Sequence, residues 1–142
     1  MTGQTMLIDY ATTLATMMNS KTHALLVAHG KVCTPQKLPR CYRRGTVREC
    51  YRNAYNLAMM HNELQYVEGL ALPDFMDIPI DHAWCIDDNG MVVDNTWPTV
   101  GKEYFGVPFD IKFVCNVIID TGHFGAIAWH SETFRKRYGG IL

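Results

Sequence analysis

Apolar positions near the start of the chain recur with the period of a helix. They are spaced three or four residues apart, at Met6, Tyr10, Leu14 and Met17. This spacing predicts an amphipathic helix over about residues 4–18. The apolar run at residues 23–30 is short and ends in a glycine, so its pattern fits either a helix or a strand. Residues 33–45 contain two prolines and end in a glycine, which predicts a loop.

A second helical pattern surrounds Cys50. The positions that share its apolar face are Cys50, Ala54, Leu57, Ala58 and His61. Thr46 and Glu49 have the spacing of a capping box. We therefore expect a helix that starts at about Val47, is capped by Thr46, and carries Cys50 in its first turn or just beyond it.

Strand patterns follow this helix. Residues 64–72 predict a strand, and residues 72–80, which contain two prolines, predict the loop after it. The clearest local signal is a β-hairpin formed by residues 82–86 and 91–97 and closed at the Asn-Gly pair at 89–90.

The last part of the chain is expected to add a strand and a helix. Residues 99–108 are predicted as a loop, and residues 109–119 as a strand because alternate positions are apolar. These positions are Ile111, Phe113, Cys115 and Val117. A basic helix over residues 131–138 is expected to end at two glycines. This order of elements predicts one α+β domain over residues 1–142, with N-terminal helices packed on an antiparallel β-sheet.

Composition excludes several classes of protein. The chain has 142 residues, of which 48% are hydrophobic and 19% charged, and this is unlike a disordered chain, a fibre or a coiled coil. No apolar run approaches the roughly 18 residues of a membrane-spanning helix. A signal peptide begins with a positively charged region, but no basic residue precedes Lys21 in this chain. We expect a cytoplasmic protein that does not bind membranes.

Charge is distributed unevenly although the net charge is only −1. Seven basic residues and a single acid, Glu49, lie between positions 31 and 52; the basic residues are Lys31, Lys37, Arg40, Arg43, Arg44, Arg48 and Arg52. Residues 61–100 contain eight acids and no lysine or arginine. The basic stretch is either a patch beside one site or the partner of the acidic half. Nucleic acid is not expected, since only Tyr42 and Tyr51 are interleaved for stacking.

The cysteines do not form a recognisable framework. Their number is odd and their spacing irregular: Cys33, Cys41, Cys50, Cys85 and Cys115. We expect no disulfide framework, but buried thiols with room for one reactive member. A zinc site formed by residues 29, 33, 41 and 50 would have no CxxC pair and none of the usual ligand spacings, so we expect no metal and no cofactor.

Three residues could together perform nucleophilic chemistry: Cys50, His82 and Asp94. A cysteine nucleophile needs an ionised thiol, a base within hydrogen-bond reach, and a group that orients the base. Cys50 is predicted near a helix N-terminus and is flanked by Arg48 and Arg52, and both features favour a thiolate.

The register of the predicted hairpin decides whether His82 and Asp94 can meet. A two-residue loop at 89–90 would put them on opposite faces. A three-residue loop with Gly90 at positive φ would pair Trp84 with Asp94 and make His82 and Asp94 diagonal neighbours about 7 Å apart. The proposed chemistry therefore requires the longer loop.

Each of these residues also has a simpler interpretation. Cys50 fits a packed helix residue, and Asp94 fits a turn that bonds the next backbone amides. Trp84 and Trp97 fit core positions.

The motif order resembles one enzyme family. Cys50 on a helix, the His-Ala-Trp at 82–84 and the Asp-x-Thr-Trp at 94–97 resemble the transglutaminase-like branch of the papain-like cysteine enzymes. The resemblance covers residues 48–97. Residues 49–109 also look like small proteins of unknown function from bacteriophage genomes. The resemblance implies that Cys50 is the nucleophile, His82 the general base and acid, and Asp94 the residue that orients His82.

One departure concerns the oxyanion. Papain-like enzymes often place a glutamine upstream of the cysteine, and residues 43–49 contain none. The Cys50 amide, with Arg44 or Arg48, would have to take this role. The residues expected to contact substrate are Arg44, Arg48, Trp84, Tyr104 and Phe105, with core packing as the alternative for the aromatic ones.

These observations predict a cysteine-dependent hydrolase or acyltransferase that acts on an amide or related acyl bond through a thioester at Cys50. Its substrate would be a small molecule or a protein, and would be anionic if the basic stretch faces the cleft. The alternative is a binding module without turnover, such as a phage-encoded inhibitor or sequestrant in the host cytoplasm.

Overall fold

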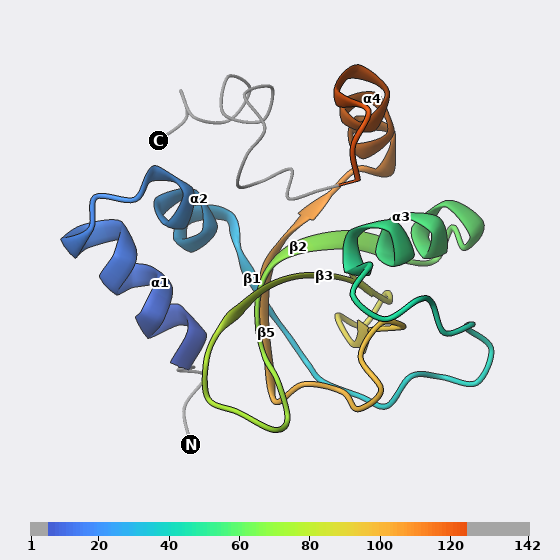
Figure 1. Cartoon of the computed structure of the whole chain (residues 1–142), viewed down its shortest axis with the longest axis horizontal. Helices are drawn as coiled ribbons and strands as arrows, with labels where there is room; N and C mark the ends of the chain where they lie inside the picture. Colours follow the sequence, from blue (N-terminus) through green and yellow to red (C-terminus); the bar gives the residue numbers. More distant parts are fainter. Residues whose placement is uncertain (1–5, 125–142) are drawn as a thin grey trace.

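The computed structural model describes residues 6–124, and this part of the chain forms four helices and five strands (Figure 1). The helices are α1 (Met6–Met17), α2 (Lys21–His29), α3 (Cys50–Met60) and α4 (Ile111–Thr121). The strands are β1 (Lys31–Cys33), β2 (Gln65–Leu72), β3 (Ile80–Ile86), β4 (Val92–Val93) and β5 (Glu103–Phe109). Helices packed on an antiparallel sheet make this the predicted α+β fold.

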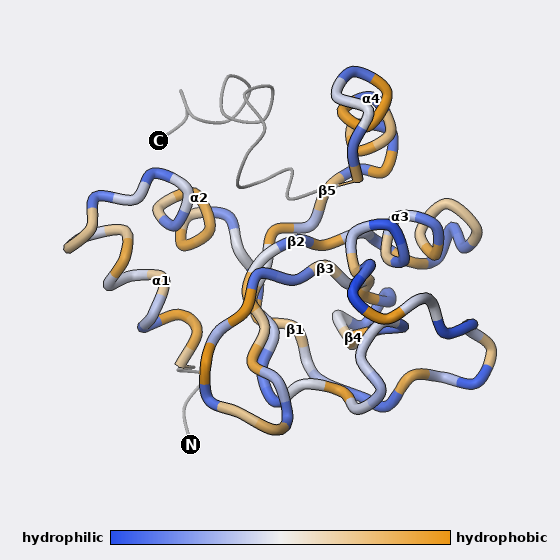
Figure 2. Tube along the Cα trace, viewed as in Figure 1, coloured by the Kyte–Doolittle hydropathy of each residue, from blue (hydrophilic) through white to orange (hydrophobic). Residues whose placement is uncertain are grey.

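The strands form a single antiparallel sheet in the order β1-β5-β2-β3-β4. Successive side chains of a strand point to opposite faces, and the two faces bury different cores. On β2, for example, Tyr66 and Leu70 belong to one core, whereas Val67 and Ala71 belong to the other. Hydrophobic positions line the strands and alternate with hydrophilic ones along α3 and α4 (Figure 2).

The two faces of the sheet bury two separate cores, which we call the helix-side core and the inner core. The helix-side core joins one face of the sheet to all four helices, and includes Leu7, Leu26, Leu57, Leu70, Ala83, Phe105 and Val114. The inner core lies on the opposite face and consists of Cys33, Val67, Ala71, Trp84, Ile86, Val92 and Tyr104. Trp97 and Val100 pack against the inner core, so a loop rather than a helix covers that face.

The N-terminal helices are present, but one predicted face and one predicted cap were wrong. The first helix forms as α1, yet its buried residues are Leu7 and Ala11, whereas Met6, Tyr10 and Met17 of the predicted apolar face are exposed. The ambiguous apolar run after it forms α2. Thr46 does not cap α3, however, because the helix begins only at Cys50 with Glu49 as its N-cap residue, without a side-chain cap. Arg48 has a φ of +73°, a left-handed conformation that prevents the helix from starting at Val47.

Two predictions in the C-terminal half were wrong. Residues 103–109, predicted within a loop, form β5, and residues 111–121, predicted largely as a strand, form α4. The side chain of Asp110 accepts a hydrogen bond from the Lys112 amide and caps this helix. Its buried residues, Phe113, Val114 and Val117, lie on one face of the helix. Phe113 and Val117 also fit the alternating pattern of a strand, which explains the wrong prediction.

Strand β5 was missed because it lies between β1 and β2 and is buried on both faces. Such a strand lacks the alternation of a half-exposed one. The basic helix predicted at 131–138 lies outside the described residues. Within residues 6–124, no helix has both the length and the apolar composition needed to cross a membrane.

Candidate active site

The hairpin between β3 and β4 has the register that the chemistry requires. Cys85 pairs with Val93 and Ile86 with Val92, and the Asp87 amide donates to the Met91 carbonyl at 3.0 Å. This pairing leaves residues 88–90 in the loop, so the loop is the three-residue form, with Gly90 at a φ of +75°. This register continues to the segment after β4 and brings Asp94 next to His82.

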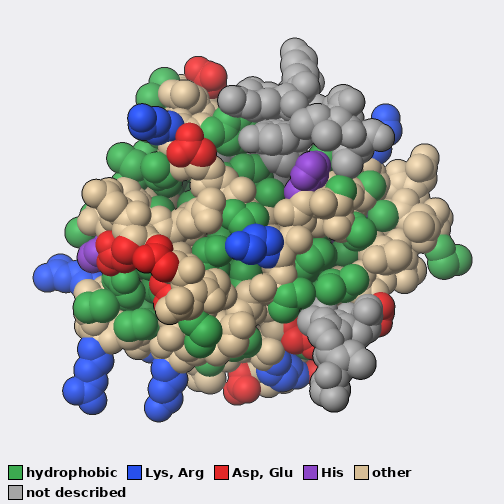
Figure 3. Space-filling view, turned by 180° about the vertical axis from the view of Figure 1, so that it is seen from behind, with side chains coloured by type: hydrophobic (Ala, Val, Ile, Leu, Met, Phe, Trp, Pro, Cys, Tyr) green, Lys and Arg blue, Asp and Glu red, His purple; other side chains and the backbone are tan. Residues whose placement is uncertain are grey.

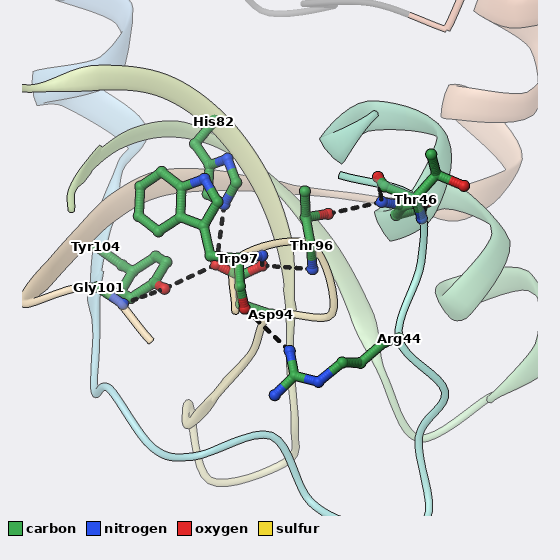
Figure 4. Close-up of polar contacts among 9 residues, drawn as sticks. Arg44, Thr46, His82, Asp94, Thr96, Trp97, Gly101 and Tyr104 are labelled. Atoms are coloured by element: carbon green, nitrogen blue, oxygen red, sulfur yellow. Dashed lines mark hydrogen bonds and ion pairs between the residues drawn. The ribbon is translucent and has the colours of Figure 1, made fainter. Parts of the chain in front are cut away.

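His82 and Asp94 form a buried hydrogen-bonded pair. The imidazole Nε2 lies 2.9 Å from Asp94 Oδ2, and the two residues are 2% and 4% exposed (Figure 4). The other carboxylate oxygen, Oδ1, accepts hydrogen bonds from the amides of Thr96 and Trp97 at 3.0 and 3.3 Å. Asp94 therefore makes the turn expected of it and holds the histidine at the same time, with one oxygen for each task.

Burial and hydrogen bonding set the charges of this pair. Burial raises the pKa of Asp94, but hydrogen bonds from His82, Thr96 and Tyr104 and the charge of His82 outweigh it, so the pKa lies below its usual value. Burial lowers the pKa of His82, but hydrogen bonds to Asp94 and Cys50 and the charges of both raise it to about 9. At neutral pH the pair is therefore a carboxylate and an imidazolium.

Cys50 completes the group from a different element. It is the first residue of α3 and is partly exposed, and the hydrogen bonding and charge of its side chain help to raise the pKa of His82. Because Nε2 is bonded to Asp94, Nδ1 is the ring nitrogen left for the thiol. Strand β4 pairs with the last two residues of β3, the segment after β4 lies beside His82, and α3 packs against β3 (Figure 1).

Aromatic side chains enclose the imidazole. The Trp97 ring stacks on it with centroids 3.9 Å apart and planes 16° apart. The Tyr104 hydroxyl donates to Asp94 Oδ2 at 2.8 Å and accepts from the Gly101 amide at 2.8 Å. Asp94 thus receives hydrogen bonds from four donors, and Trp97 covers the imidazole. This shielding keeps the charged pair in surroundings of low dielectric.

A polar clamp fixes the loop before α3, and sequence reasoning missed it. Asn53 Nδ2 donates to the Thr46 carbonyl at 2.7 Å and to Thr96 Oγ1 at 2.9 Å (Figure 4). Asn95 Nδ2 donates to the Arg43 carbonyl at 3.0 Å. The one signal in the sequence was a polar residue, Asn53, next to the apolar face of the helix.

The predicted substrate residues separate into two groups. Trp84, Tyr104 and Phe105 are at most 4% exposed, so core packing describes them better than lining an open cleft. Phe105 in addition belongs to the helix-side core, on the face of the sheet opposite His82.

The two arginines are on the surface but differ in their partners. Arg44 donates to the backbone carbonyls of Trp97 and Pro98 at 3.1 and 3.3 Å, so it holds the segment after Asp94 in place. Arg48 makes no hydrogen bond or ion pair within the described residues and lines a cavity beside the start of α3.

The basic stretch does not pair with the acidic half. Among the described residues its one ion pair is Arg52 with Glu49, which lies within the stretch itself. Lys and Arg side chains project from the edge of the molecule where Figure 1 places the loop before α3 (Figure 3). The patch interpretation therefore describes the structure better than pairing does.

The cysteines show no cross-link. All five are free thiols, and no group of three or more metal-ligating side chains occurs within residues 6–124.

No family model, curated protein or solved structure matches this chain. The resemblance to transglutaminase-like enzymes rests on the motif residues alone and stays a prediction.

Proposed function

We propose that this protein is a cysteine-dependent hydrolase or acyltransferase that acts on an amide or related acyl bond. The observation that supports it most is the buried His82–Asp94 pair beside the thiol of Cys50. A thiol, an imidazole and a carboxylate from three separate segments lie in the sequence nucleophile–base–orienting group that thiol catalysis uses, which supports the proposal.

The proposed reaction begins with the proton on His82. An imidazolium stabilises a neighbouring thiolate, so Cys50 attacks as the anion. Its sulfur forms a bond to the carbonyl carbon, and the carbonyl electron pair moves to oxygen. When the carbonyl re-forms, the bond to the leaving amine or alcohol breaks and His82 gives that group its proton. The product is a thioester at Cys50.

The second half of the reaction releases the acyl group. His82, now neutral, takes a proton from water or from an acceptor amine as that molecule attacks the thioester carbon. The carbon–sulfur bond then breaks, so that Cys50 leaves as the thiolate beside the imidazolium. Water gives hydrolysis and an amine gives transfer. Asp94 keeps the ring oriented in both halves and stabilises its charge.

The start of α3 supplies candidate donors for the oxyanion. The first N–H groups of a helix have no partner within the helix, and Glu49 makes no side-chain cap here. An oxygen that becomes negative beside Cys50 would accept hydrogen bonds from these groups. The Arg44 guanidinium is less suited to this role because it already bonds two carbonyls.

Alkylation tests the nucleophile without a known substrate. We expect iodoacetamide at about pH 6 to modify Cys50 at least about tenfold faster than Cys41, an exposed cysteine that serves as internal control. Peptide mapping by mass spectrometry reads all five sites. Asp94→Asn and His82→Ala should remove this advantage, with thermal unfolding as the check that each variant folds. Equal alkylation rates at Cys50 and Cys41 in the protein without substitutions would exclude Cys50 as the proposed nucleophile.

An activated ester tests turnover. With p-nitrophenyl acetate, thiolate attack would release p-nitrophenolate and leave one acetyl group on Cys50. Continued release beyond one equivalent, faster when an amine is added, would indicate acyl transfer.

A binding module without turnover is the second candidate. The burial of His82 favours it, because an imidazole that is only 2% exposed presents little surface to a leaving group. For this candidate we expect acetylation of Cys50 that is no faster than that of Cys41.

A further inference from the structure

A cavity of about 300 Å³ lies beside the first turn of α3. Seven described residues line it. Four of them flank Cys50 in the sequence, namely Arg48, Glu49, Tyr51 and Arg52, and the other three are Gly122, His123 and Phe124. Cys50 itself is not among the lining residues. The cavity therefore suits the part of a substrate next to the reacting carbonyl, rather than the carbonyl itself.

The two arginines of this cavity are not equivalent. Arg52 pairs with Glu49 at 3.2 Å, and its guanidinium lies 5.2 Å from the centroid of the Phe124 ring. Arg48 has no ion pair among the described residues and is exposed. Among the described lining residues, the single carboxylate, Glu49, is paired with Arg52, so no described carboxylate of the cavity compensates the charge of Arg48.

The backbone at Arg48 provides a second, independent observation. Its φ of +73° lies in the left-handed region, which costs a side chain with a Cβ about 1–2 kcal/mol. Glycine or asparagine would occupy this position at lower cost. An arginine held in this conformation two residues before the nucleophile is the kind of strain that occurs at functional sites.

We propose that this cavity binds an anionic group of the acyl substrate, a carboxylate or phosphate, and that Arg48 determines the preference for it. A guanidinium forms two parallel hydrogen bonds with either anion. The volume limits the bound portion to a small group. This inference rests on the proposed function, since it takes Cys50 as the residue that is acylated.

Two alkylating reagents test the charge preference directly. Iodoacetate and iodoacetamide both form a sulfur–carbon bond and expel iodide, and they differ in a negative charge. The measured quantity is the rate constant for iodoacetate divided by that for iodoacetamide at Cys50. This ratio is then divided by the same ratio at Cys41. We expect this quotient to exceed one, and to fall about three- to fivefold in Arg48→Asn, the size expected of one exposed cation. Added salt should lower it in the unmodified protein.

Matched variants separate charge from folding. Asparagine tolerates a positive φ, so Arg48→Asn should unfold at the same temperature as the unmodified protein or higher. Arg48→Gly is the second variant if the first fails to fold. Arg40→Asn removes the same charge from the same basic stretch, outside the cavity, and should leave the quotient unchanged.

The outcomes distinguish the two proposals. If Cys50 reacts with iodoacetamide no faster than Cys41, the proposed function fails and this inference fails with it. If Cys50 is selectively reactive but Arg48→Asn leaves the quotient unchanged, the anion site is refuted while the proposed function stands. An equal fall in Arg48→Asn and Arg40→Asn would also refute it, because net charge alone would explain the effect.

Discussion

The charge of His82 should make the stability of this protein depend on pH. Its pKa is raised from an ordinary value of 6.5 to about 9 in the folded protein, by Asp94 and Cys50 acting against burial. A shift of this size corresponds to about 3 kcal/mol of folding free energy, at roughly 1.36 kcal/mol per pKa unit. Because the pKa is raised on folding, the contribution is fully present below pH 6.5 and is lost as the pH rises to about 9.

The perturbation that isolates this effect is Asp94→Asn. Asparagine keeps the size of the side chain but removes the charge that holds the imidazolium, so the pKa of His82 should fall. We expect the variant to be less stable than the parent protein, with a difference in stability that is largest near pH 6 and decreases as the pH rises to about 9. Urea unfolding at several pH values from 5.5 to 9.5 measures the gap.

The comparison with the variant matters because buried thiols titrate nearby. Burial also raises the pKa of Cys33 and Cys85, and their contribution to stability falls at high pH in both proteins. The difference between the two proteins below pH 8.5 therefore reports mainly on His82. Histidine NMR gives the direct value, with His82→Asn to assign the resonance. A His82 pKa near 6.5, or a gap that stays constant from pH 6 to 9, would refute the reasoning.

Three further substitutions test how the site is held. Asn53→Ala removes three hydrogen bonds to Thr46 and Thr96 and should destabilise the protein by about 2–3 kcal/mol and slow Cys50 alkylation, whereas Asn56→Ala, an exposed position on the same helix, should change neither. Tyr104→Phe leaves Asp94 without one donor and the Gly101 amide unpaired, so urea unfolding should show a loss of about 2 kcal/mol and NMR a changed pKa of His82. Gly45→Ala would place a Cβ 2.2 Å from the Asn53 side chain and should cost about 1–3 kcal/mol; Gly90→Ala, which meets no neighbour, should cost only its positive φ, about 1 kcal/mol. Unchanged stability in Gly45→Ala would mean that the Asn53 side chain can shift away from residue 45 without loss of its hydrogen bonds, which would contradict this prediction.

Local chemistry made the hairpin predictable, because the Asn-Gly pair marked the turn. The sequence left the two- and three-residue loops open, and the structure shows the three-residue loop, in which His82 and Asp94 lie side by side. The periodicity also predicted a helix at α1, but not its buried face, which consists of Leu7 and Ala11. In these elements the information lies within a few neighbouring residues.

The errors between residues 103 and 121 have a different cause. Strand β5 is defined by its two neighbours, β1 and β2, which come from distant parts of the chain. A strand buried on both faces carries no alternation, and the alternating residues of α4 also fit a helix that Asp110 caps. Periodicity could not separate these cases, because the deciding interactions are non-local.

The sequence by itself indicated the candidate residues, a cysteine near the start of a helix and a histidine and an aspartate on the two sides of a hairpin, but left open whether the last two meet. Only the tertiary structure decided how they are supported. It buried Tyr104 behind Asp94, stacked Trp97 on His82, and tied the loop before α3 to the hairpin through Asn53. It also separated Arg44, which bonds backbone carbonyls, from Arg48, which faces a cavity. Neighbours along the chain encode turns and helix faces, whereas burial and hydrogen-bond partners depend on segments that meet only after folding.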